Sequence, residues 1–444
     1  MKYVLSRYNL FKEFPTAIVG VNLYIKLLFS IEKLKFDKLI SYKENLDQLE
    51  IDDPVFFSTM FKLGIIQEFY KDIAIKDILL LNNRKLSFLS QSYRLTINPT
   101  LNCNFNCWYC YEDHSNKIMT TKTMNNIIKY VNRVVENNKY TYFYLDWFGG
   151  EPLLCYNTVM RQLALNIKSI CTDNNVIFES GITTNGSLIN DNIVSFFKEI
   201  NMQSLQITLD GCKEIHNKTR FNAKYPNSYD KIVDNIVLVA KELKPINLAL
   251  RINYTADYLD NIFDIINSFP QSIRGNITVL FQQVWQDKEK HNITVSDLEN
   301  IKCRFEESGF KVDKEILNTR GYTCYADLYN QAVVNYDGRV FKCTARNFES
   351  EKEDGVLTDD GEIFWYDEIL SRKVSNATFQ NDKCMDCQFL PVCYAPCSQK
   401  VFVCKSDDEF DKYCFRYGVE ETLDFILCQF YKSGNKLRYI LDYR

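Results

Sequence analysis

Three cysteines in one short loop could hold most of a metal cluster. The run Cys103-Asn-Phe-Asn-Cys107-Trp-Tyr-Cys110 offers three thiols within eight residues and no fourth. Thiolate is the soft ligand that iron–sulfur clusters and zinc select, and a full four-iron cluster normally takes four of them. Three ligands would leave one iron of such a cluster open for chemistry. The missing fourth cysteine is therefore informative.

Zinc is the alternative metal for this loop. His114 follows Cys110 at a distance that would complete a set of three cysteines and one histidine. That alternative would not explain the Gly149-Gly150-Glu151 motif, which follows the next predicted strand. The two glycines allow a ligand to approach the backbone closely, and the carboxylate can accept a hydrogen bond from an amino group. We therefore favour a cluster with an open iron.

A second set of cysteines lies near the C-terminus. Cys324 is followed by thirteen residues, Gly338, four residues and Cys343. The remaining members are Cys384, Cys387, Cys393, Cys397 and Cys414. Two zinc knuckles are the alternative for this set. Four further cysteines have no ligand spacing and are predicted to be ordinary buried thiols, namely Cys155, Cys171, Cys212 and Cys428.

Strand-like and helix-like runs alternate over the middle of the chain and must position these residues. The predicted strands are Arg94–Asn98, Tyr140–Trp147, Val176–Thr183, Ser204–Leu209, Leu248–Tyr254 and Ile277–Gln283. The predicted helices are Thr121–Glu136, Asn157–Ile170, Asn190–Glu199, Tyr229–Leu243 and Asp257–Phe269. This alternation predicts a parallel sheet, whose active site lies at the C-terminal strand ends. Cys103, Gly149, Asn185 and Asp210 each follow one of the first four strands.

The predicted domains are residues 1–88, 89–286, a bridging segment 287–323, and 324–444. The first 88 residues contain no cysteine. In this part we predict strands at Tyr3–Leu5, Ala17–Tyr24 and Ile65–Ile66, and a helix that begins at Asp53-Pro54 and ends at Gly64. In the last parts we predict a helix at Ser296–Phe310 and a hairpin that turns at Asp337-Gly338 and returns Cys343 toward Cys324.

Composition limits the function further. The chain has 444 residues and a net charge of −4, so it has no overall basic field for nucleic acid. The apolar segment 14–31 contains Asn22 and Lys26 and is better explained by a buried hairpin or helix than by a membrane span. We find no secretory signal, and most of the sixteen cysteines are clustered at short ligand spacings, which favours a reducing compartment, so we expect a cytoplasmic protein.

Three motifs together resemble the radical S-adenosylmethionine (radical SAM) superfamily. They are residues 99–110, Trp147-Phe-Gly-Gly-Glu-Pro-Leu-Leu154 and Gln206-Ile-Thr-Leu-Asp-Gly211. The later cysteines resemble the SPASM subgroup of that superfamily. The resemblance implies an α/β fold with a partial (β/α)6 barrel and a C-terminal cysteine-rich SPASM domain. It also implies a [4Fe-4S] cluster on Cys103, Cys107 and Cys110 that cleaves S-adenosylmethionine to a 5′-deoxyadenosyl radical.

The resemblance also implies roles for residues around the cluster. The expected contacts to S-adenosylmethionine are Tyr109, Gly149, Gly150, Glu151, Thr183, Asn185, Arg251 and Asn253. Asp210 is expected to face the cavity from the fourth strand as a catalytic residue. Asp210, His216 and Arg220 belong to a stretch similar to one that recurs in SPASM enzymes, and we expect His216 to order a loop rather than to act as a base.

Two auxiliary [4Fe-4S] clusters are implied by the second set of cysteines. Carried over by position, Cys384, Cys387, Cys393 and Cys414 would close one cluster. Cys324, Cys343 and Cys397 would hold the other, with Cys303 or Cys404 as candidate fourth ligands. Some relatives have an extra cysteine just before the position of Cys324, whereas Asn318 and its neighbours offer none, so this cluster could be open to substrate.

The leading functional prediction is a maturase that modifies a ribosomally synthesised peptide by a thioether, a carbon–carbon or carbon–oxygen cross-link, or epimerisation. A flavodoxin or ferredoxin would donate electrons, and residues 1–88 resemble a winged-helix module that holds a precursor's leader, or else form a stabilising cap. One alternative is a sulfatase-type maturase, although Thr344 stands where those relatives tend to have a basic Asp. Another is a non-catalytic iron–sulfur or zinc scaffold.

Overall fold

The structure is a computed structural model that describes residues 2–137, 140–222, 224–287, 293–313, 317, 324–374, 379, 381–393 and 397–440. The chain forms two compact units. The barrel unit comprises Ser90–Asp313 and Tyr329–Ser371, and the cysteine-rich unit comprises Met1–Leu89, Lys314–Leu328 and Arg372–Arg444. His291, Asn318 and much of the predicted bridging segment lie outside the described residues.

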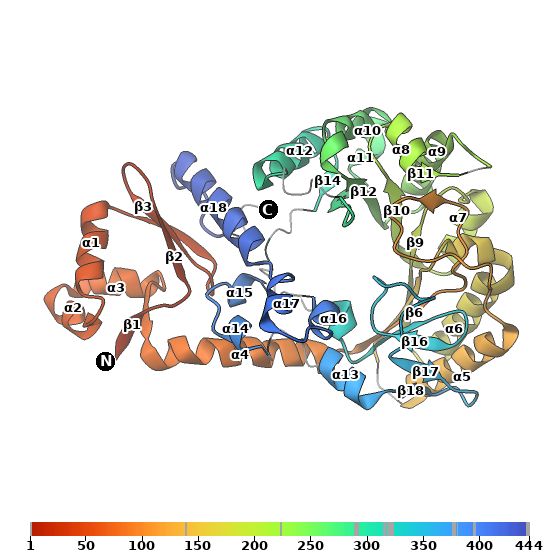
Figure 1. Cartoon of the computed structure of the whole chain (residues 1–444), viewed down its shortest axis with the longest axis horizontal. Coiled ribbons are helices and arrows are strands. Elements are labelled where there is room, and N and C mark those ends of the chain that lie inside the picture. The colour runs from red at the N-terminus through yellow and green to blue at the C-terminus, as the bar shows by residue number, and fades with distance from the viewer. Residues whose placement is uncertain are drawn as a thin grey trace. The chain divides into compact units, whose positions relative to one another are not determined.

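The barrel unit is built on six parallel strands that pair in chain order (Figure 1). They are β6 (Ser92–Ile97), β8 (Tyr142–Trp147), β9 (Ile177–Thr184), β10 (Met202–Leu209), β12 (Asn247–Tyr254) and β13 (Ile277–Gln283). The short strand β14 (Lys311–Val312) adds to β13. All six predicted strands are found with small differences at their ends, which confirms the partial α/β barrel.

Helices cover the outer side of this sheet in Figure 1. They include α5 (Thr121–Asn137), α6 (Arg161–Asp173), α7 (Asp191–Glu199), α9 (Ser228–Glu242) and α12 (Val295–Glu307). The prediction of one helix at Asp257–Phe269 was wrong. That stretch forms the 3-10 turns η3 (Ala256–Tyr258) and η4 (Asp260–Phe263) and the four-residue α10 (Asp264–Asn267). Its Asp and Asn side chains favour turns over helix interiors, which is the physical reason.

The two faces of the barrel sheet differ in polarity. On β8, Phe143, Leu145 and Trp147 are buried in the core that the helices cover, whereas the alternate residues Tyr144 and Asp146 lie on the other face. Parallel sheets are usually apolar on both faces. Here the inner face carries polar side chains, which indicates a ligand site inside the barrel.

The predicted hairpin at Asp337-Gly338 is confirmed, but it joins the barrel sheet. Strand β15 (Gln331–Val334) pairs antiparallel with β16 (Arg339–Phe341) and parallel with β6. Gly338 has a φ of 87°, a conformation that its turn requires. Strands β17 (Gly355–Leu357) and β18 (Ile363–Trp365) continue the sheet. The hairpin therefore covers the free edge of β6. The predicted domain boundary at residue 324 does not coincide with the division into compact units, because residues 329–371 belong to the barrel unit.

The N-terminal residues form two small sheets in the cysteine-rich unit. Strand β1 (Tyr3–Leu5) pairs with β5 (Ile66–Glu68), and β2 (Asn9–Glu13), β3 (Ile18–Asn22) and β4 (Leu27–Ile31) form an antiparallel sheet. The helices are α1 (Lys33–Ser41), α2 (Leu46–Asp52), α3 (Pro54–Lys62) and α4 (Phe69–Phe88). The side chain of Asp53 caps α3 as predicted. Segment 14–31 contains the β3–β4 hairpin, which confirms that expectation.

On one face of the sheet formed by β2, β3 and β4, the buried core is shared with a later part of the chain. Val19 and Val21 of β3 share a buried cluster with Leu423 and Ile426 of the C-terminal helix α18 (Arg416–Lys432). Six cysteines of this unit, from Cys384 to Cys414, lie on or beside short helices, namely α14 (Asp382–Met385), α15 (Leu390–Cys393), α16 (Ser398–Val401) and α17 (Asp407–Asp411). Helix α13 (Asp367–Val374) precedes them.

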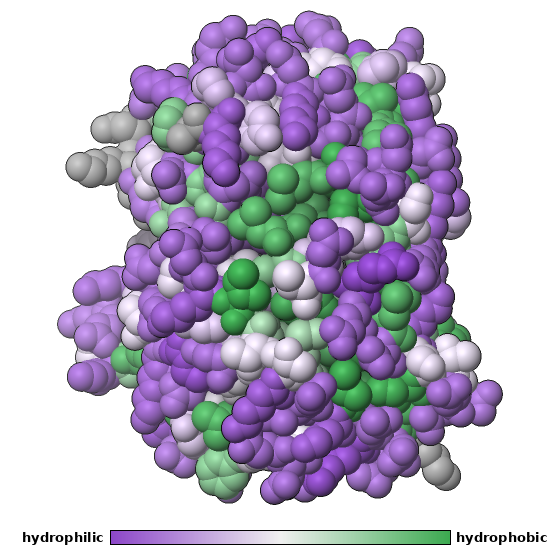
Figure 2. Space-filling model, turned by 90° about the vertical axis from the view of Figure 1, so that its right-hand side faces the viewer, coloured by the Kyte–Doolittle hydropathy of each residue, from purple (hydrophilic) through white to green (hydrophobic). Residues whose placement is uncertain are grey.

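The large apolar side chains are concentrated in three buried clusters. The face drawn in Figure 2 is mainly hydrophilic, with hydrophobic residues gathered in smaller groups. Within the described part of the chain, no helix is both long and apolar enough to cross a membrane.

Candidate functional site

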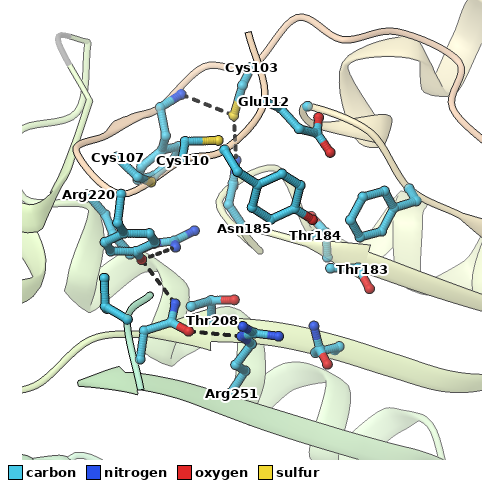
Figure 3. A pocket seen from close by; sticks show the side chains of 18 of the residues that line it. Cys103, Cys107, Cys110, Glu112, Thr183, Thr184, Asn185, Thr208, Arg220 and Arg251 are labelled. Carbon is cyan, nitrogen blue, oxygen red and sulfur yellow. Dashed lines mark hydrogen bonds between the residues drawn. The ribbon is translucent and has the colours of Figure 1, made fainter. Parts of the chain in front are cut away.

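A cavity of about 190 Å³ lies at the C-terminal ends of the barrel strands (Figure 3). Its wall contains the cysteine loop, the glycine turn after β8 and residues from β9, β10 and β12. The predicted residues on this wall are Cys103, Cys107, Cys110, Tyr109, Gly149, Gly150, Thr183, Asn185, Arg251 and Asn253. The fold therefore brings together the three motifs that were recognised separately in the sequence.

The cysteine loop is held by backbone hydrogen bonds and by one buried aromatic ring. The backbone N–H of Phe105 donates to the Sγ of Cys103 at 3.4 Å, and the ring of Phe105 is buried. Strand β7 (Asn106–Cys107) pairs with β11 (Arg220–Phe221). Burial raises the pKa of Cys103 to about 12 and that of Cys107 to about 11. The thiols of Cys103, Cys107 and Cys110 all line one cavity, and three thiols form the donor set that an iron–sulfur cluster with one open iron takes.

The glycine turn touches the backbone of the cysteine loop directly. Gly149 has a φ of 103°, and a Cβ on Gly150 would lie 2.4 Å from the carbonyl oxygen of Leu101 and 2.3 Å from that of Asn102. The N–H of Glu151 donates to the same Asn102 oxygen at 2.8 Å. Glycine is therefore required because two backbones meet here, and the cavity side of the turn stays open to a ligand.

Glu151 lies behind the cavity wall and is not among the lining residues. Its carboxylate is fully buried and accepts hydrogen bonds from the N–H of Leu153 at 3.0 Å, the hydroxyl of Thr184 at 2.8 Å and the N–H of Asn185 at 2.8 Å. The carboxylate thus ties the end of β9 to the glycine turn. A buried carboxylate needs hydrogen-bond donors, and here these are protein groups. The expected contact of Glu151 to the cofactor stays a prediction.

Asp210 also lies behind the wall, where Tyr109 covers it. The hydroxyl of Tyr109 donates to the Asp210 carboxylate and accepts from Arg220 at 2.8 Å and from the amide of Asn253 at 3.1 Å. Asp210 is buried and is not among the lining residues, and its expected catalytic role stays a prediction. Because Asp210 orients Tyr109, we assign it a positioning role.

His216 orders the turn that follows β10. Its Nδ1 accepts a hydrogen bond from the N–H of Asp210 at 3.3 Å, and its ring packs edge-on against Tyr229. Burial, with a smaller effect of Arg220, lowers the pKa of His216 well below its usual value. The side chain is therefore neutral and serves the loop rather than acting as a base.

Arg251 brings a positive charge to the floor of the cavity (Figure 3). Its Nε donates to the Oδ1 of Asn253 at 2.9 Å, which fixes the orientation of the guanidinium. Burial lowers the pKa of Arg251, but an arginine remains charged at neutral pH. Arg251 can therefore bind an anionic group such as a carboxylate.

Several lining residues were not assigned from the sequence. They include Tyr111, Glu112, Phe148, Thr184, Gln206, Thr208, Arg220, Trp285 and Gln286. Gln206 and Thr208 alternate with buried Leu205, Ile207 and Leu209 along β10, so their period of two could have placed them on the inner face. Burial raises the pKa of Glu112 to about 8, and no pattern in the sequence predicts that this carboxyl group is buried.

Four cysteines of the second set are close together in the cysteine-rich unit. Burial raises the pKa of Cys384 to about 12, and the thiols of Cys393, Cys414 and Cys387 raise it further. Such mutual effects require short separations. Among the described residues, no group of three His, Cys, Asp or Glu side chains is arranged to hold a single metal ion.

The other three cysteines of this set fall in different units. The segments that carry Cys324 and Cys397 are joined within the cysteine-rich unit by a hydrogen bond from Ser398 to Asp327. Cys343 is buried in the barrel unit. Cys303 is exposed on α12, and the thiol of Cys404 donates to the carbonyl oxygen of Lys400 at 3.4 Å. Their assignment as cluster ligands stays a prediction.

Three of the four cysteines without ligand spacing are buried as predicted, namely Cys155, Cys171 and Cys212. Cys428 differs, since it is partly exposed and lies 3.5 Å from the Nζ of Lys12. It lies on α18, which carries buried residues on one side only.

Residues 97–266 match the sequence model of the radical SAM superfamily. This range contains the cysteine loop, the glycine turn and the barrel strands β8, β9, β10 and β12. Residues 97–266 therefore form a radical SAM domain, and the protein is an enzyme of that type. The family implies a [4Fe-4S] cluster and S-adenosylmethionine, and the three cavity thiols fit that requirement.

Two curated relatives resemble most of the chain. The cysteine-type anaerobic sulfatase-maturating enzyme of Clostridium novyi is 25% identical, over 69% of this chain and 88% of that protein. The radical SAM cyclopropyl synthase TigE of Paramaledivibacter caminithermalis is 24% identical, over 66% of this chain and 65% of that protein. The solved structure of anSMEcpe with bound AdoMet aligns with a TM-score of 0.55 at 17% identity, covering 78% of this chain and all of that one. This structural likeness supports the fold.

Proposed function

We propose that this enzyme is a maturase that modifies a ribosomally synthesised peptide or protein. The observation that carries the proposal is the cavity that unites three thiols, an open glycine turn and polar strand ends. The sulfatase-maturating relative supports a protein or peptide substrate, because it resembles more than two thirds of this chain. The product would be a thioether, a carbon–carbon or carbon–oxygen cross-link, or an epimerised residue.

The positions of several cavity residues suggest roles in binding the cluster and the cofactor. A [4Fe-4S] cluster on Cys103, Cys107 and Cys110 would supply the electron that cleaves S-adenosylmethionine into methionine and a 5′-deoxyadenosyl radical. The cavity face of Gly149 and Gly150 would present backbone groups to the amino acid part of that cofactor. Polar groups of β9, β10 and β12 would bind the ribose and carboxylate, namely Thr183, Thr208, Arg251 and Asn253.

The second set of cysteines would hold two auxiliary [4Fe-4S] clusters. Cys384, Cys387, Cys393 and Cys414 supply four ligands for one cluster, and their mutual proximity supports this assignment. Cys324, Cys343 and Cys397 would hold the other, with Cys303, Cys404 or the substrate at its fourth iron. We further propose a flavodoxin or ferredoxin as electron donor, a cytoplasmic location, and a leader-binding role for residues 1–88 by strand addition.

Release of 5′-deoxyadenosine tests the enzymatic part of this proposal. Anaerobically reconstituted protein, reduced in the presence of S-adenosylmethionine, should release the nucleoside, and Cys107→Ala should abolish the release. Cys428→Ser is the control, because Cys428 is partly exposed and lies outside the cavity. Turnover of Cys107→Ala at the wild-type rate would contradict the assignment. Mass spectrometry of a co-expressed candidate precursor would then identify the substrate.

A sulfatase-type maturase is the second candidate, and the relative from Clostridium novyi favours it. Thr344 counts against it, because a hydroxyl group does not replace a carboxylate as a base at neutral pH. Its backbone oxygen accepts a hydrogen bond from Tyr111 at 3.3 Å. A mass change in a sulfatase-derived peptide, rather than in a precursor peptide, would favour this candidate.

A further inference from the structure

Arg220 lies beside the cysteine loop, although it is 110 positions from Cys110 along the chain. In the pairing of β7 with β11, Arg220 stands directly opposite Cys107. The side chain is buried and lines the cavity together with all three cysteines (Figure 3). A short β-ladder thus carries a permanent positive charge to the cluster site.

The guanidinium of Arg220 is held in a fixed position. Its Nη1 donates to the Tyr109 hydroxyl at 2.8 Å, and the group lies 5.7 Å from the centre of the Phe105 ring. The Tyr109 hydroxyl in turn donates to Asp210. The Nε of Arg220 is buried and has no hydrogen-bond partner among the described residues. An unused donor in a buried site points to an acceptor that arrives with the cofactor.

The charge of Arg220 acts on every thiol of the loop. Burial is the main cause that raises the pKa of Cys103, Cys107 and Cys110, and the Arg220 charge opposes it in each case. A thiolate-ligated cluster becomes more negative when it accepts an electron. A cation fixed nearby in a low-dielectric site stabilises the added charge.

We propose that the positive charge of Arg220 raises the reduction potential of the cluster held by Cys103, Cys107 and Cys110. The cluster would then accept an electron more readily. Hydrogen bonding and charge around the sulfurs are known means by which proteins set such potentials. The proposal requires the cluster alone. It does not depend on the identity of the peptide or protein substrate.

The test is a redox titration of the reconstituted full-length protein in the absence of S-adenosylmethionine. Dithionite reduces the cluster by one electron, and electron paramagnetic resonance monitors the reduction. To isolate this cluster, the titration is made in a background in which Cys324, Cys384 and Cys387 are replaced by Ala. Arg220→Gln should shift the midpoint potential to a more negative value, and Arg220→Lys should restore most of the shift because it keeps the charge. Arg274→Gln is the matched control, because Arg274 is bonded to the carbonyl oxygens of Phe269 and Ser308.

A second variant gives a test of opposite sign. Asp210→Asn removes a negative charge that shares the Tyr109 hydroxyl with Arg220, so the midpoint should shift to a more positive value. This variant keeps the test decisive if Arg220→Gln fails to assemble the cluster. An unchanged midpoint in either assembled variant would overturn the proposal. Weaker binding of S-adenosylmethionine by Arg220→Gln with an unchanged midpoint would instead make Arg220 a cofactor ligand, and would also overturn it.

Discussion

At Gly150 the space for a side chain is already filled by the backbone of the cysteine loop. A Cβ atom would lie within 2.4 Å of the carbonyl oxygens of Leu101 and Asn102. Overpacking of this kind costs about 1–3 kcal/mol. Gly150→Ala should therefore displace the loop and lower both the iron content of this cluster and 5′-deoxyadenosine release by roughly tenfold or more, since ~1.4 kcal/mol is a factor of ten.

Gly275→Ala is the control for this substitution, because the Gly309 oxygen, at 3.8 Å, is the only atom of the described residues that would lie within 4 Å of its Cβ. Iron analysis and nucleoside release should leave this control near wild type. A Gly150→Ala protein with full release would show that the loop tolerates the added methyl group.

His216 makes a prediction about pH. Its pKa in the folded state is lowered by burial, so the folded protein keeps it neutral while the unfolded chain binds a proton below about pH 6.5. The free energy of unfolding therefore decreases as the pH falls below that value, and His216 contributes up to about 1.4 kcal/mol per pH unit to this decrease. His216→Asn keeps an acceptor for the Asp210 N–H and removes the titration. The melting temperature of this variant should fall less steeply than that of wild type between pH 6.5 and 5, and identical slopes would contradict the prediction.

At the scale of elements, the Glu151 carboxylate joins two strand ends. It connects the glycine turn after β8 to the end of β9 through Thr184 and Asn185. Glu151→Ala leaves buried donors without an acceptor, which costs about 1–3 kcal/mol for each such group. We expect a lower melting temperature and faster amide exchange at residues 184–186. Glu199→Ala is the control, since its ion pair with Arg161 is exposed and contributes less than about 1 kcal/mol. Equal effects of the two substitutions would argue against a joining role for Glu151.

At the scale of the whole molecule, each of the two compact units carries a group of cysteines for which we propose a cluster. The cluster proposed for Cys384 and its neighbours lies in the cysteine-rich unit, whereas the cavity lies in the barrel unit. Cys384→Ala should therefore lower the iron content by about four atoms per chain, the content of one [4Fe-4S] cluster. It should still release 5′-deoxyadenosine without substrate, because the cavity cysteines are unchanged. Unaltered iron content would contradict the auxiliary cluster.

The strands of the barrel could be predicted because residues facing the helices alternate with residues facing the barrel interior, and this alternation is a local pattern. Strand β13 was predicted at its exact bounds, Ile277–Gln283. The prediction of a helix at Asp257–Phe269 was wrong because it relied on the spacing of apolar residues. It did not take into account that the Asp and Asn residues of this stretch favour turns. The hydrogen-bond partners of Glu151 and Asp210 could not be predicted, since spacing alone cannot tell which side of a turn a carboxylate faces.

The sequence by itself determined the three-cysteine loop, the order of the strands and the family, because ligand spacing and strand periodicity depend on residues that are near one another in the chain. The tertiary structure decided which polar groups surround that loop. Arg220 reaches Cys107 through a β-ladder, and β15 covers the free edge of β6, from distant parts of the chain. Such contacts depend on packing and long-range hydrogen bonds, which no local pattern of side chains specifies.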